Sequence, residues 1–431
     1  MSATSIEVRR FRHRSTVRLR RPRGHLLVGL AVVAAVSIIL PSAVANAVTA
    51  ASKWVPVGVQ TPSGRFSSYS FGSTSCISST SCFSASTGIT SAEVEDVFVE
   101  HWNGKSWSTM KLPSIGQAAA IGTTCLSAAD CWFVGAGFSK GYPTHAIILH
   151  WNGKKWRVSP SPSIKTASAL NGIACYSSGC FSTGVECVKG TACFSLNGTF
   201  WTAPVRPLVE SWNGKSWSIS KSVQPGGTYA ASLNEVRCSS ASQCVTIGVE
   251  ATTAKSPSIA YSEVWNGKAW KVKAVPVPPE THHDPNSTGL NDLACTSASD
   301  CVAVGGATAQ TSGLSIPAPL IEKWNGSKWT ISKLGLAQSG PLTLQDVSCL
   351  SASRCAVVGY SDGYVVPSFA AAGTWNGSSL TLGTGASKLG KLTDTQLFTV
   401  GCAGASTCVA LGEGHSGSAL KVIAEESSLP K

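Results

Sequence analysis

Charged residues are scarce in this sequence of 431 residues: Asp, Glu, Lys and Arg make up only 13% of it, against roughly 25% in an ordinary globular domain. The formal net charge is +12, but the arginines and Glu7 within the first 47 residues account for +7 of it and leave +5 for the rest. A nucleic-acid-binding face would need lysines and arginines clustered on the folded domain. The sequence therefore argues against nucleic acid as a partner.

Arginine is especially rare after residue 47, and a sialidase-type site would need several arginines that converge on a carboxylate, with a Tyr/Glu pair and an Asp acid. The arginines of this region are spread over different parts of the chain: Arg65, Arg157, Arg206, Arg237 and Arg354. There is also no His-Glu-x-x-His zinc motif and no phosphate-binding loop. We therefore expect no catalytic residues, no metal and no cofactor.

Long apolar runs are absent with one exception, residues 26–40. These 15 residues are too few for a bilayer-spanning helix, which needs about 20. A basic run precedes them, and Pro41 and the small-x-small segment Ala45-Asn46-Ala47 follow, as in a signal peptide. We predict a signal peptide at residues 1–47 and one domain at residues 48–431, secreted, extracellular or in the cell envelope. An uncleaved N-terminal anchor is the alternative, so membrane contact is expected only during export or through that anchor.

Cysteine, in contrast, is abundant, and all 16 cysteines follow the predicted signal peptide. An even number at regular spacing in an exported chain indicates disulfides rather than zinc sites, whose pairs are closer and recur with a second pair. Near neighbours form the simplest pairs, although a nested arrangement of Cys175, Cys180, Cys187 and Cys193 is an alternative. The predicted pairs are Cys76/Cys82, Cys125/Cys131, Cys175/Cys180, Cys187/Cys193, Cys238/Cys244, Cys295/Cys301, Cys349/Cys355 and Cys402/Cys408.

The cysteine pairs belong to a repeat whose first cysteines are 49, 50, 63, 57, 54 and 53 residues apart. A short apolar run closed by Gly follows the second cysteine, and a Trp-Asn-Gly-x-x-Trp segment comes later in the unit. Each unit reads as four strands, and such a period is typical of propeller blades. We expect the tryptophans to fill the core between blades, since large rings recur in every unit. The first tryptophans are Trp102, Trp151, Trp212, Trp265, Trp324 and Trp375.

Asn-Gly between the last two strands is the strongest short hairpin signal, because both residues accept the positive φ of a type I′ turn. A two-residue turn at Asn103-Gly104 would set Trp102 opposite Lys105 and Glu100 opposite Trp107. Glutamates recur two residues before the tryptophan, which favours a structural partner on the sheet over a catalytic group. They are Glu100, Glu210, Glu263 and Glu322.

The two ends of the chain are complementary parts of one unit. Ser52-Lys53-Trp54 repeats Ser327-Lys328-Trp329, where a fourth strand begins, and the last unit supplies three strands only. Pairing the N-terminal strand into the last unit, near Val422, closes a ring and removes exposed sheet edges. The prediction is an all-β, seven-bladed β-propeller of four-stranded antiparallel blades with one disulfide per blade, which we expect to be a monomer.

The Gly-x-x-Trp turn resembles the end of the Asp-box repeat of sialidase-like propellers, although tryptophan stands at the Asp position. As a whole, residues 51–426 resemble the secreted actinobacterial-type Trp-Asn-Gly/Cys-repeat β-propellers. This resemblance implies a fold and a compartment, and no particular activity.

The third unit departs from the repeat, since it adds Cys187/Cys193 and Trp201 between its second and third strands. Loops on a rigid scaffold often bind ligands, so we predict Trp201 in this loop (residues 183–206) and His282, His283 and Asp284 in a Pro-rich loop as ligand-binding residues. A neutral insertion, a solvated loop or a metal site at His282-His283-Asp284 are the alternatives. The favoured function is a non-catalytic scaffold that binds a glycan or a protein through one loop face. The alternatives are a sialidase-like glycoside hydrolase or lyase that uses loop carboxylates, and a structural wall component.

Overall fold

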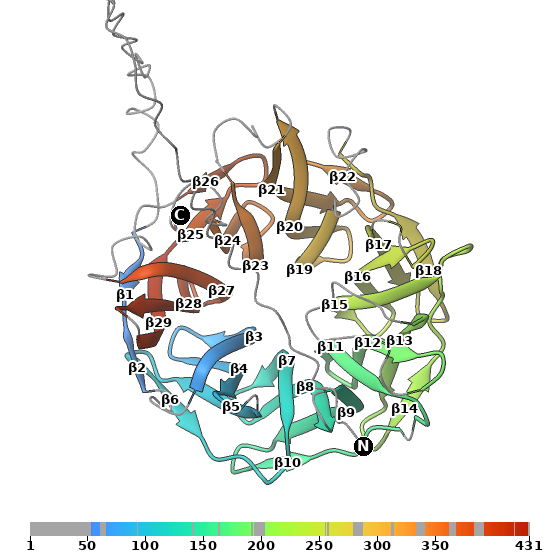
Figure 1. Cartoon of the computed structure of the whole chain (residues 1–431), viewed down its shortest axis with the longest axis horizontal. Coiled ribbons are helices and arrows are strands. Elements are labelled where there is room, and N and C mark those ends of the chain that lie inside the picture. The colour runs from blue at the N-terminus through green and yellow to red at the C-terminus, as the bar shows by residue number, and fades with distance from the viewer. Residues whose placement is uncertain are drawn as a thin grey trace, which may run out of the picture. The chain divides into compact units, whose positions relative to one another are not determined.

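The structure is a computed structural model, and its elements in the described residues are all β-strands (Figure 1). It describes residues 53–60, 66–92, 94–139, 142–162, 164–190, 193, 203–254, 256, 258–278, 288–311, 314–332, 341–361, 368–382, 392–417 and 419–429. Within these ranges no helix is long and apolar enough to cross a bilayer. The described residues belong to one compact unit, Thr49–Lys431. The predicted signal peptide lies outside them.

The strands form seven sheets, antiparallel apart from one strand of the first, and we number them as blades 1 to 7 in chain order. Blade 1 contains β2 (Gly58–Gln60), β3 (Phe66–Ser78), β4 (Ser81–Thr90), β5 (Glu95–Trp102) and β6 (Ser106–Met110). Blade 2 contains β7 (Ala118–Ser127), β8 (Asp130–Ser139), β9 (Tyr142–Trp151) and β10 (Trp156–Val158). Blade 3 contains β11 (Ser168–Tyr176), β12 (Gly179–Cys187), β13 (Val205–Trp212) and β14 (Trp217–Ser220).

The remaining blades repeat this pattern of four strands. Blade 4 contains β15 (Ala230–Ser240), β16 (Gln243–Ala251), β17 (Ile259–Trp265) and β18 (Trp270–Ala274). Blade 5 contains β19 (Thr288–Ser297), β20 (Asp300–Thr311), β21 (Leu314–Trp324) and β22 (Trp329–Ile331). Blade 6 contains β23 (Thr343–Ser351), β24 (Arg354–Ser361), β25 (Phe369–Trp375) and β26 (Leu380–Leu382). Blade 7 contains β27 (Thr393–Ala403), β28 (Thr407–Ser416), β29 (Ala419–Ser428) and β1 (Val55–Pro56).

The ring closes as predicted, with the N-terminal strand in the last blade (Figure 1). Val55 is paired with Glu426 and Pro56 with Glu425 in antiparallel register. Trp54 is 2% exposed and belongs to the same buried cluster as Ile423 of β29. The fold prediction of seven four-stranded blades and this closure is therefore confirmed.

One strand was not anticipated. After leaving blade 7 the chain continues as β2, which pairs in parallel with β6 at the outer edge of blade 1, with Val59 opposite Trp107. Blade 1 therefore has five strands, because the segment that closes the ring also covers the edge of the neighbouring sheet.

The predicted register of the Asn-Gly hairpins is wrong. Trp102 lies opposite Trp107 and not opposite Lys105, so the loop is longer than two residues. The reason is the asparagine side chain: Oδ1 of Asn103 accepts hydrogen bonds from the backbone N–H groups of Lys105 and Ser106, both at 3.0 Å. This side-chain turn takes the place of a type I′ turn, while Gly104 still adopts a positive φ of 91°.

A disulfide clamps the first two strands of every blade, and each clamp joins the near neighbours that the spacing predicts. The two bonded cysteines face each other across the strand pair, as Cys238 and Cys244 do. The seven clamps are Cys76–Cys82, Cys125–Cys131, Cys175–Cys180, Cys238–Cys244, Cys295–Cys301, Cys349–Cys355 and Cys402–Cys408.

The eighth disulfide, Cys187–Cys193, lies in the third unit, so the neighbour pairing and not the nested one is the arrangement found there. The prediction of one disulfide per blade therefore holds for six blades, whereas blade 3 has two. The reason is that its insertion carries a cysteine pair of its own, separate from the clamp.

The two cysteines of a clamp differ in exposure, which the spacing did not predict. The first cysteine is half-buried in every blade. The second starts the strand that packs against the next blade, and it is at most 2% exposed. These second cysteines therefore belong to the core as well as to the disulfides. They are Cys82, Cys131, Cys180, Cys244, Cys301, Cys355 and Cys408.

The core lies between adjacent blades, where the tryptophan pair of one blade packs against the second strand of the preceding blade. Trp156 and Trp151 of blade 2, for example, contact Phe83 of blade 1 at ring distances of 6.5 and 6.4 Å. The fully or nearly buried tryptophans are Trp54, Trp102, Trp107, Trp132, Trp156, Trp217, Trp270, Trp324, Trp329 and Trp375. Three first tryptophans are half-buried instead, namely Trp151, Trp212 and Trp265.

The first strands line the ring's centre, and side chains at their bulges bind the next blade. Asn171 donates to the carbonyl of Leu233, Asn234 to Leu290, and Asn291 to Leu344, at 2.7 to 3.0 Å. Each bulge leaves a residue outside the strand pairing. The asparagine amides use this position to hold successive blades in register.

Candidate ligand pocket between blades 4 and 5

The residues predicted to bind a ligand, Trp201, His282, His283 and Asp284, lie outside the described residues, so their role stays a prediction. The structure does describe the base of the predicted loop in blade 3. Cys187 and Cys193 are buried and bonded there, and Arg206 donates to Glu186 at 2.7 Å. A cavity of about 350 Å³ lies beside this ion pair.

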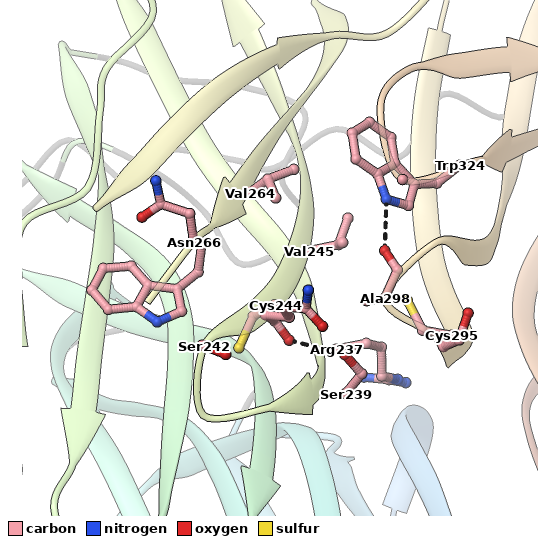
Figure 2. A pocket seen from close by; sticks show the side chains of 14 residues that line it. Arg237, Ser239, Ser242, Cys244, Val245, Val264, Asn266, Cys295, Ala298 and Trp324 are labelled. Atoms are coloured by element: carbon pink, nitrogen blue, oxygen red, sulfur yellow. Dashed lines mark hydrogen bonds between the residues drawn. The ribbon is translucent and has the colours of Figure 1, made fainter. Parts of the chain in front are cut away.

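A second cavity lies between blades 4 and 5, at the end of the blades that carries the disulfide connections and the Asn-Gly turns (Figure 2). Its volume is about 250 Å³. Indole rings, hydroxyls, amides and one guanidinium surround it. The lining residues are Arg237, Ser239, Ser242, Gln243, Cys244, Val245, Val264, Trp265, Asn266, Cys295, Ser297, Ala298, Trp324 and Gly326.

Beside this pocket, blade 4 has a small residue at a position where blades 1 to 3 have an aromatic one and blades 5 to 7 also have a small one. The residue after the second cysteine fills the space beside the next blade's tryptophan pair. Phe181 lies 5.2 Å from both Trp265 and Trp270, and Trp132 lies 5.2 Å from Trp212. In blade 4 the same position is Val245, which packs with Trp324 and Trp329 of blade 5 and leaves space beside them.

Long cationic side chains cross two other boundaries where the corresponding residue is small. Lys323 of blade 5 donates to the carbonyl of Gly377 in blade 6 at 2.9 Å. Arg354 of blade 6 donates to the carbonyl of Ala405 in blade 7 at 3.0 Å. The corresponding positions of blade 4 are Val264 and Gln243, which line the pocket. These shorter side chains explain why the groove at this boundary stays open.

The two indoles of the pocket differ in exposure. Trp324 is 2% exposed, and its Nε1–H donates to the carbonyl of Ala298 at 3.1 Å, as Figure 2 shows. Trp265 is half-buried, and its Nε1–H donates to the carbonyl of Ala241 at 3.0 Å. Since both N–H groups are occupied, the indoles present carbon surface to the pocket.

Among the described residues of the lining, Arg237 is the only charged one. It comes from β15, immediately before Cys238, and 27% of its side chain is exposed. Nη1 lies 2.5 Å from Oε1 of Glu235 and donates to the carbonyl of Val236. Nη2 donates to Oδ1 of Asp292 in blade 5 at 3.2 Å. These contacts use part of the donors of a guanidinium and join the two walls of the pocket.

The carboxyls behind Arg237 continue into the next blades. Oδ2 of Asp292 accepts from the backbone N–H of Val347, and Oδ2 of Asp346 accepts from that of Val400, both at 3.0 Å. Burial raises the pKa of Asp346 well above its ordinary value, and the neighbouring Asp292 carboxylate raises it further. Burial likewise raises the pKa of Glu235 to about 7, against the lowering effect of Arg237.

Neutral polar groups make up the rest of the lining. Oδ1 of Asn266 is used inside its own turn, where it accepts from Lys268 and Ala269, so its Nδ2 is the group that faces outward. Ser239, Gln243 and Ser297 are exposed at the rim. Among the described residues there is no group of three or more His, Cys, Asp or Glu side chains that could hold a metal ion.

The recurring glutamates lie in the core, away from this pocket. Glu100, Glu210, Glu263 and Glu322 are 0% exposed. Glu425 occupies the same position in blade 7 and is also 0% exposed. Burial raises the pKa of Glu100 and of Glu322 to about 8. The prediction of a structural role fits this placement, although the expected partners are missing: both carboxyl oxygens of Glu100, Glu322 and Glu425 have no hydrogen-bond partner in the described structure.

Two Gly-x-Ser-x-Gly strings occur in the chain, at residues 137–141 and 359–363. Such a string carries a nucleophile only at a sharp turn from a strand into a helix. Here β8 ends at Ser139 and β24 at Ser361, and the next described element of each blade is the third strand of the same sheet. Ser361 is also buried. The strings therefore mark strand ends.

No protein-family profile matches the sequence, and no curated protein sequence matches it. Its structural neighbours are β-propellers, including sialidase-like folds. A Trypanosoma rangeli sialidase in complex with the inhibitor DANA is 9% identical, with 75% of this chain and 56% of that chain covered and a TM-score of 0.44. A PL25 ulvan lyase is 10% identical, with 86% and 94% covered and a TM-score of 0.46.

The six-bladed fucose-binding lectin of Aleuria aurantia is 11% identical, with 88% of this chain and 95% of that chain covered and a TM-score of 0.40. The neighbours thus include a lectin, a sialidase and a lyase. They do not decide between a binding protein and an enzyme.

The pocket between blades 4 and 5 was not predicted from the sequence, because it lies within the regular repeat and not in an irregular loop. The sequence does change from an aromatic to a small residue after the second cysteine at Val245, but blades 5 to 7 share the small residue, so the change does not single out this boundary. Only the packing of that position against the next blade gives the change its meaning.

Proposed function

We propose that this protein is an exported, non-catalytic β-propeller that binds a glycan in the pocket between blades 4 and 5. The observation that carries the proposal is the lining of this pocket: carbon surface from Trp265, hydroxyls and amides at the rim, and Arg237 as its one charged group. Pockets that combine apolar walls with a few placed polar groups are typical ligand sites. Among the described residues, the lining holds no carboxyl pair of the kind that flanks a scissile sugar bond in glycosidases.

The cysteines and the repeat support an extracellular location. Eight disulfides are consistent with an extracellular location. The likeness to secreted Trp-Asn-Gly/Cys-repeat propellers and the N-terminal segment point the same way. At such a location the protein would encounter the glycans of a cell surface or cell wall.

The test is a glycan microarray probed with the oxidised protein, followed by isothermal titration calorimetry on the best ligand. The decisive variant is Val245→Phe, which places in blade 4 the residue that blades 1 and 3 already have at this position. We expect binding to weaken by at least about 10-fold, because one buried contact of 1.4 kcal/mol corresponds to that factor. Stability should be unchanged or higher, as for other cavity-filling substitutions.

Val272→Phe is the matched control, since Val272 lies on β18 of the same blade, is 37% exposed and lines another surface. It should bind as the wild type does. Unchanged binding by Val245→Phe would contradict the pocket assignment. New reducing ends or unsaturated products, detected by mass spectrometry after incubation with the ligand, would replace the proposal with the hydrolase or lyase alternative.

A further inference from the structure

We propose that the pocket between blades 4 and 5 selects an uncharged sugar ring and rejects a ring that carries a carboxylate. This inference rests on the proposed function, because it names the class of glycan that the same pocket would take. It follows from the size of the pocket, the groups that line it and the charges behind Arg237.

The size limits the ligand to a single unit. A volume of about 250 Å³ is below the roughly 300–1,000 Å³ of pockets for drug-sized ligands. One ring of a longer chain would enter, and the rest of that chain would extend over the exposed rim at Ser239 and Ser242.

The lining matches a ring that has both polar edges and an apolar face. The indole of Trp265 offers carbon surface, since its N–H is bonded to Ala241. The amides of Asn266 and Gln243 and the remaining N–H groups of Arg237 offer donors, and serine hydroxyls offer both donors and acceptors. Sugar hydroxyls can donate to and accept from such groups at once.

The charge of Arg237 is already balanced before a ligand arrives. Glu235 and Asp292 both contact the guanidinium, and Asp346 lies against Asp292. A ligand carboxylate bound to Arg237 would come close to the carboxylates of Glu235 and Asp292, and repulsion between like charges in a desolvated site is costly. A ligand amine would be repelled by the positive charge of the guanidinium itself. Both considerations favour a ring without charge.

The same contacts join blade 4 to blade 5, so the competing interpretation is that Arg237 is only a structural link between blades. The two interpretations differ in what happens when a carboxylate beside Arg237 is replaced by an amide. A purely structural link predicts lower stability with no change in ligand preference. A charge-balanced recognition site predicts a change in preference towards acidic sugars.

The experiment uses matched pairs of probes that differ only in a carboxylate: methyl glucoside with methyl glucuronide, and methyl galactoside with methyl galacturonide. Affinities are measured by saturation-transfer NMR and calorimetry at pH 8, above the pKa of about 7 to which burial raises Glu235. We expect the neutral member of the preferred pair to bind at least about 10-fold more tightly than its acid, as expected for one added like charge. Val245→Phe should abolish the binding.

Glu235→Gln and Asp292→Asn each remove a negative charge beside Arg237 while keeping an oxygen acceptor. In either variant the preference for the neutral sugar should shrink by about 10-fold or reverse; two variants are used because one of them can fail to fold. Glu186→Gln is the matched control, because it removes a carboxylate from the Glu186–Arg206 pair of blade 3, outside this pocket. It should leave the preference unchanged.

The possible failures are distinguishable. If the acidic sugars bind as tightly as the neutral ones and Val245→Phe abolishes that binding, the selectivity inference is overturned while the proposed function stands. A neutral preference that neither amide variant changes also overturns it, since charge balance is then not the cause. If no glycan on the array and neither member of any pair binds, the proposed function itself fails.

Discussion

Five glutamates occupy one position of the repeat, two residues before the first tryptophan or its counterpart, and all are fully buried. Burying a charged carboxylate costs much free energy, whereas burying a carboxyl that keeps its proton costs far less. Burial accordingly raises the pKa of Glu100 and Glu322 to about 8 and that of Glu210, Glu263 and Glu425 to about 7. These glutamates therefore act as neutral, proton-holding residues of the core.

This placement predicts that the protein is most stable in mild acid. In the unfolded chain the carboxyls release their protons near the ordinary value of 4.5, whereas the folded protein keeps them up to about 7 or 8. The folded state thus binds more protons over this window, so the free energy of unfolding falls as pH rises from about 4.5 to about 8 and then levels off. We expect a loss of at least about 3 kcal/mol between pH 5 and pH 8, which is what a single carboxyl with a pKa of about 7 contributes, measured by urea denaturation.

Glu425→Gln tests the cause, because glutamine has the same shape and no proton to lose. The variant should lose less stability between pH 5 and pH 8 than the wild type does, and should exceed it at pH 8. Glu426→Gln is the matched control, since Glu426 is the next residue and is half-buried; its pH profile should follow the wild type. A flat profile for the wild-type protein would contradict the argument.

At the scale of single elements, the Asn-Gly hairpins show how a side chain can set the length of a turn. The asparagine Oδ1 accepts two backbone N–H groups in each described copy, as Asn266 does from Lys268 and Ala269 at 3.0 Å. The following glycine takes a positive φ, 88° at Gly267. This geometry lets the two tryptophans of the hairpin face each other, Trp265 opposite Trp270.

Gly267→Ala should destabilise the protein by about 1–2 kcal/mol, because a Cβ at positive φ is strained. The added Cβ would also lie 3.0 Å from Cβ of Ser242. The free energy of unfolding from urea titration measures the effect. Gly226→Ala is the control, since a Cβ there would meet no atom within 4 Å; equal stability of the two variants would contradict the role assigned to this turn.

For the whole molecule, the ring depends on one short N-terminal strand. β1 makes only two residue pairs with β29, but it brings Trp54 into the core between blades 6 and 7, together with Ala356 and Leu429. Closing the ring in this way removes two sheet edges at once. The stability of the entire propeller therefore depends on this contact.

Trp54→Ala should lower the free energy of unfolding by about 3–5 kcal/mol, the usual cost of removing a buried tryptophan from a core. Thermal unfolding monitored by circular dichroism measures it. Val55→Ala is the control, because Val55 is the next residue and is 40% exposed, and such surface changes usually stay within about 0.5 kcal/mol. A Trp54→Ala protein as stable as this control would show that the ring does not need its closing strand.

The number of blades, their strand order and the closure were predictable from the sequence, because each depends on local patterns that recur: a cysteine pair, an apolar run, a Trp-Asn-Gly turn, and chain ends that complete each other. The core role of the tryptophans followed for the same reason. The turn register was not predictable, since Asn103 could form either a type I′ turn or a side-chain turn, and only the pairing of Trp102 with Trp107 decides between them. The additional edge strand β2 likewise depends on where the closing segment passes blade 1.

The sequence by itself determined a closed ring of disulfide-clamped blades, because the repeat unit recurs along the chain and its first and last segments together complete one unit. Only the tertiary structure decided how the boundary between blades 4 and 5 forms its pocket. That depends on how Val245 and Val264 of blade 4 pack against Trp324 of blade 5, and on the contact of Arg237 with Asp292 across the boundary. The physical reason is that a cavity is a property of side chains from separate segments, and no single segment encodes the space left between them.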